Sequence, residues 1–324
     1  MNERILITGA NGFIGSRLTQ YALDRGHRVK VVTRSAEDVR KFPWGKDVEI
    51  FQAEDIGREE RWPRVLEGLS AVVHLAGKAH VAEEGDPLKA RQYFEVNTLG
   101  TVRLASAAAR AGISRFVFVS SVKVNGRSTP PGQAFSEEDA VHPSGAYALS
   151  KWEAERRLWR LAAATGLEVV VVRPPLVYGP GVKANMLALL KVVDKGLPLP
   201  LAGIHNKRSY VGLSNLTDLL ATCVGHPAAA GQTFLAGDGS DLSTPDLIRA
   251  ISKALHRPCR LLPFPPSLLR AASCARPSVG TALLDSLSVD AGKARRTLAW
   301  APPVPFEVGM QEMADWYLET GKAS

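Results

Sequence analysis

The sequence predicts an α/β protein built on a doubly wound parallel sheet, with a smaller lobe formed by the C-terminal part of the chain. Short apolar runs alternate with helical patterns through the first half of the chain, as expected for strand–helix–strand units with right-handed crossovers. Several runs are apolar without alternation, such as FVFV at 116–119 and VVVV at 169–172. Strands that are covered on both faces have this pattern. A chain of 324 residues is long enough for one or two domains.

Each expected element follows from a local pattern. RILITG opens the chain as an apolar run, and a helical pattern with polar and apolar faces follows before the second run, HRVKVVTR. The same alternation continues to LEVVVVRPP, the last strand of the first half. The expected strands are residues 4–9, 27–34, 47–55, 71–77, 115–121 and 167–175, and the expected helices are residues 13–25, 93–111 and 147–165.

The second half of the chain differs in composition. Proline becomes frequent, as in LPLPLAG, PFPPS and APPVPF, which suits a smaller lobe over the carboxyl edge of the sheet, where ligands of open α/β sheets bind. We expect residues 1–174 to form the sheet domain, joined again by about 211–238, and residues 175–210 and 239–324 to form the lobe. Residues 260–287 are partly apolar and hold several arginines. They fit either a packed lobe helix or a surface that touches a membrane or a partner.

The composition argues against several classes of protein. Hydrophobic residues make up 45% of the chain and charged residues 22%, as in soluble globular proteins. There is no apolar run of membrane-spanning length and no secretory signal pattern, so we expect a cytoplasmic protein without an integral membrane segment. The three cysteines lack CxxC or metal-site spacing, and we expect reduced thiols and no metal. The charge of +8 is scattered, which disfavours nucleic acid and fits phosphate-bearing small ligands.

A glycine-rich motif, TGANGFIG, lies between the first strand and the first helix. Gly9 permits a tight turn, Gly12 lets the backbone approach a pyrophosphate, and Gly15 allows close packing of helix on strand. The helix amino end adds free N–H donors and a positive dipole. Because the motif lies between a strand and a helix, it predicts dinucleotide binding rather than a plain loop.

The end of the second strand indicates which dinucleotide is bound. NAD binding usually needs a carboxylate there for the ribose hydroxyls, whereas this chain has Thr33-Arg34-Ser35. Arg34 can pair with a 2′-phosphate, and Arg17 in the first helix could reach the same group. We therefore expect NADP(H), with NAD(H) as the alternative. Asp55, after the third strand, either holds the adenine edge or caps the following turn.

Tyr147 and Lys151 are one helical turn apart, on one face of the third expected helix. A cation beside a phenol favours phenolate, so we expect Lys151 to lower the pKa of Tyr147. Ser121, at the end of the fifth strand, could bind the same substrate oxygen. Together with the glycine loop, the three residues predict a catalytic site.

With these motifs, the chain resembles the extended short-chain dehydrogenase/reductase family. The resemblance also includes HLAG at 74–77, Asn97 and RPPLVYGPG at 173–181. It implies that the tyrosine exchanges a proton with a sugar oxygen, that the lysine also binds the nicotinamide ribose, and that the serine orients the oxygen. It further implies a homodimer as one option. The implied cofactor site comprises Gly9, Asn11, Gly12, Phe13, Ile14, Gly15, Arg17, Arg34, Asp55, Ile56, Leu75, Ala76, Gly77, Lys151 and Pro174.

The second lobe is similar to that of nucleotide-sugar enzymes. Asn185 matches an asparagine that meets the diphosphate in UDP-sugar epimerases, and Arg208 matches an arginine that clamps a substrate phosphate. A second phosphate-binding arginine, usual in these epimerases, has no clear counterpart. The implied substrate site comprises Lys78, His80, Ser121, Lys123, Tyr147, Asn185 and Arg208.

The segment SSVKVNG helps to choose among activities. Sugar 4,6-dehydratases of the family carry Thr-Asp-Glu where this chain has Ser121-Val122-Lys123, so we do not expect dehydration. The segment is more similar to that of bacterial enzymes that reduce 4-keto-6-deoxy UDP-N-acetylhexosamines. Lys123 would contact the sugar or diphosphate, or donate to the 4-oxygen; alternatively it reaches water or pairs with Glu137.

The resemblance therefore implies an NADPH-dependent 4-ketoreductase of polysaccharide synthesis, such as that of lipopolysaccharide. Net reduction consumes its cofactor, which suits the NADPH pool. The first alternative is a UDP-hexose or UDP-N-acetylhexosamine 4-epimerase with bound NAD. The second, from another class, is an NADP(H)-sensing or nucleic-acid-binding protein on the same fold.

Overall fold

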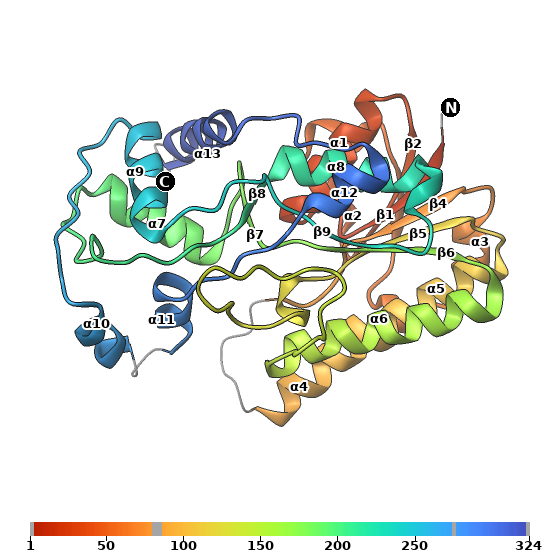
Figure 1. Ribbon diagram of the computed structural model, residues 1–324. Helices are drawn as coiled ribbons and strands as arrows, with labels where there is room; N and C mark the ends of the chain where they lie inside the picture. The colour runs from red at the N-terminus through yellow and green to blue at the C-terminus, as the bar shows by residue number, and fades with distance from the viewer. Residues whose placement is uncertain (1–2, 80–85, 274–276, 322–324) are drawn as a thin grey trace.

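The computed structural model describes residues 3–79, 86–273 and 277–321. Seven parallel strands form one sheet (Figure 1), and the strand order reverses between β1 and β4. This confirms the predicted doubly wound parallel sheet, whose switch point is the place where such sheets bind ligands. In sheet order the strands are β3 (Glu49–Gln52), β2 (Arg28–Thr33), β1 (Arg4–Thr8), β4 (Ala71–His74), β5 (Arg115–Val119), β6 (Glu168–Arg173) and β9 (Thr233–Leu235).

Helices cover both faces of the sheet because successive side chains of each strand point to opposite sides. Ile5 and Val117 pack into one core, and Leu6 and Phe116 into the other. One face is covered by α1 (Phe13–Asp24), α8 (Leu213–Gly225) and α12 (Gly292–Leu298), and the other by α3 (Trp62–Leu66), α5 (Thr101–Arg110) and α6 (Gly145–Thr165) (Figure 1). Two further helices of this part of the chain are α2 (Ala36–Arg40) and α4 (Pro87–Tyr93).

A third core lies beyond the carboxyl edge of the sheet. Tyr178, Met186, Ile248 and Met313 are buried in it. Its elements are β7 (Leu176–Tyr178) and β8 (Tyr210–Gly212), which form a two-stranded sheet, with α7 (Ala184–Asp194), α9 (Thr244–Ala254) and α13 (Phe306–Gly321). The lobe also carries α10 (Pro266–Ser273) and α11 (Pro277–Leu284), which lie at its far end from α1 and α8 (Figure 1).

The division of the chain between the two parts remains a prediction. After the first lobe segment the chain returns to the sheet: α8 packs on one face of it, and β9 pairs with β6. In addition, Ala294, Leu298 and Trp300, which the prediction assigns to the lobe, are buried in the sheet core. In the described part of the chain, no helix has the length and apolarity needed to cross a bilayer.

One expected element differs in its interior. The sequence predicts a helix from 93 to 111, and the structure has α4, a π-helical stretch η3 (Phe94–Gly100) and then α5. Each π-type turn holds one residue more than an α-helical turn. The expected periodicity of 3.6 therefore does not describe the segment that contains Asn97.

Candidate active site

The glycine loop between β1 and α1 forms a backbone cradle. Gly9 has a φ of +70°, and a Cβ there would lie 2.9 Å from the amide nitrogen of Ala76. A Cβ on Gly15 would lie only 2.1 Å from the carbonyl oxygen of Gly9. Gly12 has no side chain to cap α1, so the first-turn N–H groups remain available as donors at the positive end of the helix. These residues fit the pyrophosphate of a dinucleotide.

Two arginines lie near the carboxyl end of β2 and the start of α1. Arg34 is exposed, and within the described residues it takes part in no hydrogen bond or ion pair. The amide of Ser35 donates to Thr33 Oγ1 at 3.2 Å, which fixes the turn that presents Arg34. Arg17 is also exposed, and its Nη2 lies 3.5 Å from Ser214 Oγ on α8. Both cations are exposed and can therefore meet an anionic ligand.

Other predicted cofactor contacts surround the loop. Asp55 caps a short 3-10 helix, its Oδ1 accepting from the Gly57 amide at 2.8 Å, so the structure shows the capping alternative. Ile56 packs on the core beside α3 and α5. Asn11 is exposed at the loop tip. Phe13 packs against the core of the second lobe and joins the two parts of the molecule.

A buried hydrogen-bond chain fixes the ends of β1 and β4. Thr8 Oγ1 accepts from the amides of Leu75 at 3.2 Å and Ala76 at 3.1 Å, so it donates its own proton to His74 Nδ1 at 2.7 Å. His74 Nε2 therefore carries the imidazole proton and donates to Thr101 Oγ1 at 2.9 Å. Burial lowers the pKa of His74 to about 3, which keeps the imidazole neutral.

Asn97 connects the loop after β4 to α6. Its Oδ1 accepts from the Lys78 amide at 2.8 Å, and its Nδ2 donates to the Lys78 carbonyl and to Ser150 Oγ, each at 3.0 Å. A Cβ on Gly77 would lie 2.9 Å from Asn97 Oδ1 and 3.4 Å from Lys151 Nζ. Only a glycine therefore lets the backbone pass this close to the candidate catalytic lysine.

Tyr147, Lys151 and Ser121 converge at the carboxyl edge of β5. Tyr147 and Lys151 lie in the first two turns of α6, and Ser121 lies just after β5. A hydrogen bond with Ser121 acts to lower the pKa of Tyr147, but burial outweighs it and raises this pKa to about 12. The phenol is therefore protonated at neutral pH.

The expectation that Lys151 lowers the pKa of Tyr147 is wrong for this arrangement. Lys151 Nζ donates to the carbonyl oxygen of Val119 at 2.9 Å and lies 4.7 Å from the Phe118 ring centroid. Burial lowers the pKa of Lys151 itself to about 8, so part of its charge is lost near neutral pH. Desolvation has the largest effect on both residues because burial penalises the charged form of each.

Sequence reasoning missed a buried ion pair behind Lys151. Glu155 is one turn further along α6, and its Oε2 lies 2.5 Å from Arg173 Nη2. Ser120 donates a short hydrogen bond to the same carboxylate, and Asn125 accepts from Arg173 at 3.1 Å. The negative charge of Glu155 opposes the fall in the pKa of Lys151. The spacing Tyr147, Lys151, Glu155 along one helix face could have indicated this residue.

Lys123 lies beside the candidate catalytic tyrosine. Its Nζ is 5.8 Å from the centroid of the Tyr147 ring, and its side chain is exposed. Tyr93 packs edge-on against the same ring, with centroids 5.8 Å apart. Glu137, the predicted alternative partner of Lys123, accepts from the Leu235 amide at 2.7 Å. The preceding residue, Val122, is anchored by an N–H···O bond of 3.0 Å to Pro174.

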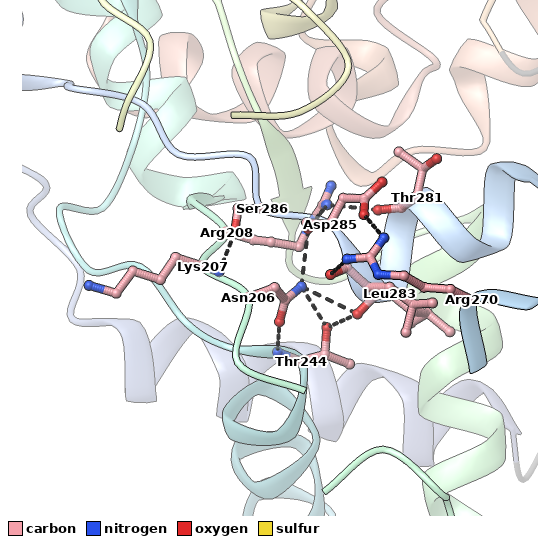
Figure 2. Close-up of polar contacts among 10 residues, drawn as sticks. Asn206, Lys207, Arg208, Thr244, Arg270, Thr281, Leu283, Asp285 and Ser286 are labelled. Carbon is pink, nitrogen blue, oxygen red and sulfur yellow. Dashed lines mark hydrogen bonds and ion pairs between the residues drawn. The ribbon is translucent and has the colours of Figure 1, made fainter. Parts of the chain in front are cut away.

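Figure 2 shows the predicted phosphate clamp of the second lobe. Arg208 Nη1 donates to the carbonyls of Thr281 at 3.1 Å and Asp285 at 2.8 Å. Burial lowers the pKa of Arg208, while the nearby Asp285 acts in the opposite direction. Arg270 Nη1 lies 2.6 Å from Asp285 Oδ1. A second arginine thus lies next to Arg208, and sequence reasoning missed it because the two are far apart in the chain.

The remaining predicted substrate residues are more dispersed. Asn185 is exposed in the first turn of α7. Lys78 points its Nζ at Gln92 Oε1, 2.5 Å away on α4. His80 lies outside the described residues.

Comparison with known proteins assigns the chain to a family. The sequence model of the NAD dependent epimerase/dehydratase family matches residues 5–237. The chain belongs to this family. The predicted resemblance to extended short-chain dehydrogenases/reductases is therefore confirmed, and the protein is an enzyme of the sugar-nucleotide epimerase, dehydratase and reductase type.

Individual family members agree with this assignment along the whole chain. The protein is 40% identical to UDP-glucose 4-epimerase of Vibrio cholerae, over 98% of this chain and 97% of that protein. UDP-glucose 4-epimerase of Thermotoga maritima, solved with UDP-glucose, has the same fold with a TM-score of 0.79 at 21% identity, over 98% and 99% of the two chains. The UDP-glucose 4-epimerase of Thermus thermophilus, solved with NAD, has a TM-score of 0.77 at 26% identity. The match covers 97% of this chain and 99% of that chain. The expected homodimer and cytoplasmic location stay predictions.

Proposed function

We propose that this family member reduces the 4-keto group of a UDP-4-keto-6-deoxy-N-acetylhexosamine with NADPH, giving a UDP-QuiNAc or UDP-FucNAc type product for polysaccharide synthesis. The observation that carries the proposal is Arg34, a cation at the carboxyl end of β2 that is exposed and unpaired among the described residues. No carboxylate accompanies it in Thr33-Arg34-Ser35. A 2′-phosphate would complement this charge, and an NADP(H) preference favours net reduction.

The protonation state of Tyr147 supports the same direction of reaction. When bound, NADPH supplies the hydride that a ketone needs. The residues of the chain would supply the proton: burial keeps Tyr147 protonated with a pKa of about 12, and an acid is what an emerging alkoxide requires. Ser121 would hold the same oxygen. Lys151, whose pKa is about 8, would bind the ribose and restore the proton on Tyr147.

The second lobe would hold the nucleotide part of the substrate. Arg208 and Asn185 would bind the diphosphate, Arg208 through the guanidinium donors that the carbonyls of Thr281 and Asp285 leave available. Lys123, beside the Tyr147 ring, would contact the sugar near its reacting oxygen. Val122 and Lys123 replace the two acids of dehydratases, so elimination of water is not part of the proposal.

The alternative is a UDP-hexose or UDP-N-acetylhexosamine 4-epimerase with bound NAD. It is favoured by the 40% identity to the Vibrio cholerae protein named UDP-glucose 4-epimerase. In such an enzyme Tyr147 would first take the proton of the 4-hydroxyl as a general base and later return it.

One experiment separates these activities. The purified protein is incubated with 4-keto UDP-sugars and NADPH or NADH, with NAD(P)H absorbance followed and the product read by NMR. Stoichiometric consumption of NADPH supports the reductase, whereas interconversion of UDP-hexoses without net cofactor use establishes the epimerase. Tight NADP(H) binding with neither reaction would leave a sensor protein.

A further inference from the structure

Exposed apolar side chains gather at one end of the second lobe. Leu262 is 50% exposed, Phe264 41% and Leu268 55%, and all three lie in or just before α10. Leu197, 50% exposed, lies in the loop after α7. We call these four residues the apolar edge. Exposed apolar groups that cluster, rather than lie singly, usually mark an interaction surface.

Backbone pairing brings the two segments of the apolar edge together. Leu199 and Leu261 form a parallel bridge, with the Leu199 amide donating to Arg260 at 2.8 Å and the Leu262 amide donating to Leu199 at 2.8 Å. Leu199, Leu261 and Leu269 pack against the lobe core. The inner side chains thus anchor the segments, while the apolar edge remains in solvent.

The sequence around the apolar edge is rich in basic residues, although Arg249 and Arg270 are paired with Asp246 and Asp285. From Leu247 to Leu284 the sequence contains six lysines and arginines and no aspartate or glutamate. Arg260 is exposed beside Leu262, and Lys195 is exposed beside Leu197. Asp194, an acid close to Lys195 in the chain, pairs with Arg257 at 2.9 Å. The apolar edge therefore has a basic border.

We propose that the apolar edge is a docking surface for an anionic lipid bilayer. Apolar side chains that flank exposed cations insert at the level of the headgroups, while the cations pair with anionic lipids. A second copy of the chain would bring two basic borders together, which like-charge repulsion disfavours. In the view of Figure 1, α10 lies away from α1 and α8, so docking at this end leaves the cofactor half of the molecule in water.

The docking surface is connected to the candidate substrate site. Arg270, on α10 next to the apolar edge, pairs with Asp285, and the carbonyl of Asp285 accepts from Arg208 at 2.8 Å (Figure 2). Docking would thus hold the substrate lobe at the membrane surface. The proposal does not depend on which sugar the enzyme uses.

Vesicle flotation of the full-length protein tests the proposal. We expect binding to vesicles of equal parts phosphatidylcholine and phosphatidylglycerol, weaker binding at high salt, and little binding to phosphatidylcholine alone. The double variant Leu262→Ser/Leu268→Ser should lower the partition coefficient at least about tenfold, because two inserted leucines are lost. The matched variant Leu88→Ser/Val308→Ser removes similarly exposed apolar groups elsewhere and should bind as wild type.

A second readout reports the location of contact. Cys259 is exposed and free, next to Arg260, so a polarity-sensitive dye can be attached there in a Cys274→Ser background. Its emission should shift to the blue with anionic vesicles. The proposal is overturned by absence of vesicle binding, by equal loss in both double variants, or by an apolar edge that proves to be covered by a second copy in light scattering. Circular dichroism checks that both variants are folded.

Discussion

The ammonium of Lys123 lies 5.8 Å from the ring centroid of Tyr147. A cation at this distance interacts with the ring and with any negative charge that develops on the oxygen bound to it. The two residues come from different elements, the short 3-10 helix after β5 and the first turn of α6. Their proximity gives the first prediction.

Replacing Lys123 by Met should lower turnover at least about tenfold, because an aligned charge contact at the reacting oxygen is lost. The free energy of unfolding should change by less than about 0.5 kcal/mol, because the side chain is exposed. The measurements are initial rates at saturating substrate and urea unfolding. Lys46→Met, at another exposed lysine, should retain full activity. Unchanged turnover in Lys123→Met would remove the proposed role.

Tyr147→Phe should lower the rate about 10³-fold, because the positioned acid is lost. The ring contacts with Tyr93 are kept, so NADPH binding, followed by fluorescence titration, should remain within about threefold of wild type, roughly the scatter of a conservative change. A variant that retains more than about a tenth of the wild-type rate would show that another group protonates the product.

Arg34→Ala should raise the KM for NADPH about tenfold or more and leave the KM for NADH unchanged, because only NADPH carries the 2′-phosphate. Arg40→Ala removes a neighbouring exposed arginine of α2 and serves as the matched control. Equal effects of Arg34→Ala on both cofactors would contradict the NADP(H) assignment and favour the epimerase.

The buried Lys151 should make stability depend on pH. Its folded-state pKa is about 8, below the usual 10.5, because burial disfavours the charged form. Between these values the unfolded chain binds more protons than the folded one, so the free energy of unfolding rises with pH. We therefore compare the free energies of unfolding of wild type and Lys151→Met. Between about pH 8 and about pH 9, the wild-type value should rise by about 1 kcal/mol relative to that of the variant.

Urea unfolding at about pH 7, 8 and 9 measures this shift. The window ends near pH ~10, where the raised pKa of Tyr147 begins to act in the opposite direction: the folded phenol keeps its proton while the unfolded one loses it. If the two free energies of unfolding differ by the same amount at every pH, Lys151 is not desolvated.

Local patterns predicted the sheet and the tight glycine turn between β1 and α1. The apolar strands and the glycine spacing around Gly9 are properties of short segments, and short segments carry their own structural preference. The resemblance placed Ser121, Tyr147 and Lys151, and the structure brings them to one edge of the sheet.

The properties that depend on burial or on distant contacts could not be read in this way. The pKa of Tyr147 follows from desolvation, and the Lys151 amine donates to Val119 on β5, which no helix spacing indicates. The pairing of Arg270 with Asp285 depends on how α10 packs beside α11. Such contacts appear only once the chain is folded.

The wide turn at Phe94–Gly100 sets the angular phase of everything that follows it in the helix. Deleting one residue there would rotate α5 by ~100° about its axis, turning Thr101 away from His74 and Leu104 out of the core. The extra residue thus lets one continuous helical segment point Asn97 toward α6 and, further along, the apolar face of α5 toward the sheet. A regular α-helix through this segment would not meet both requirements.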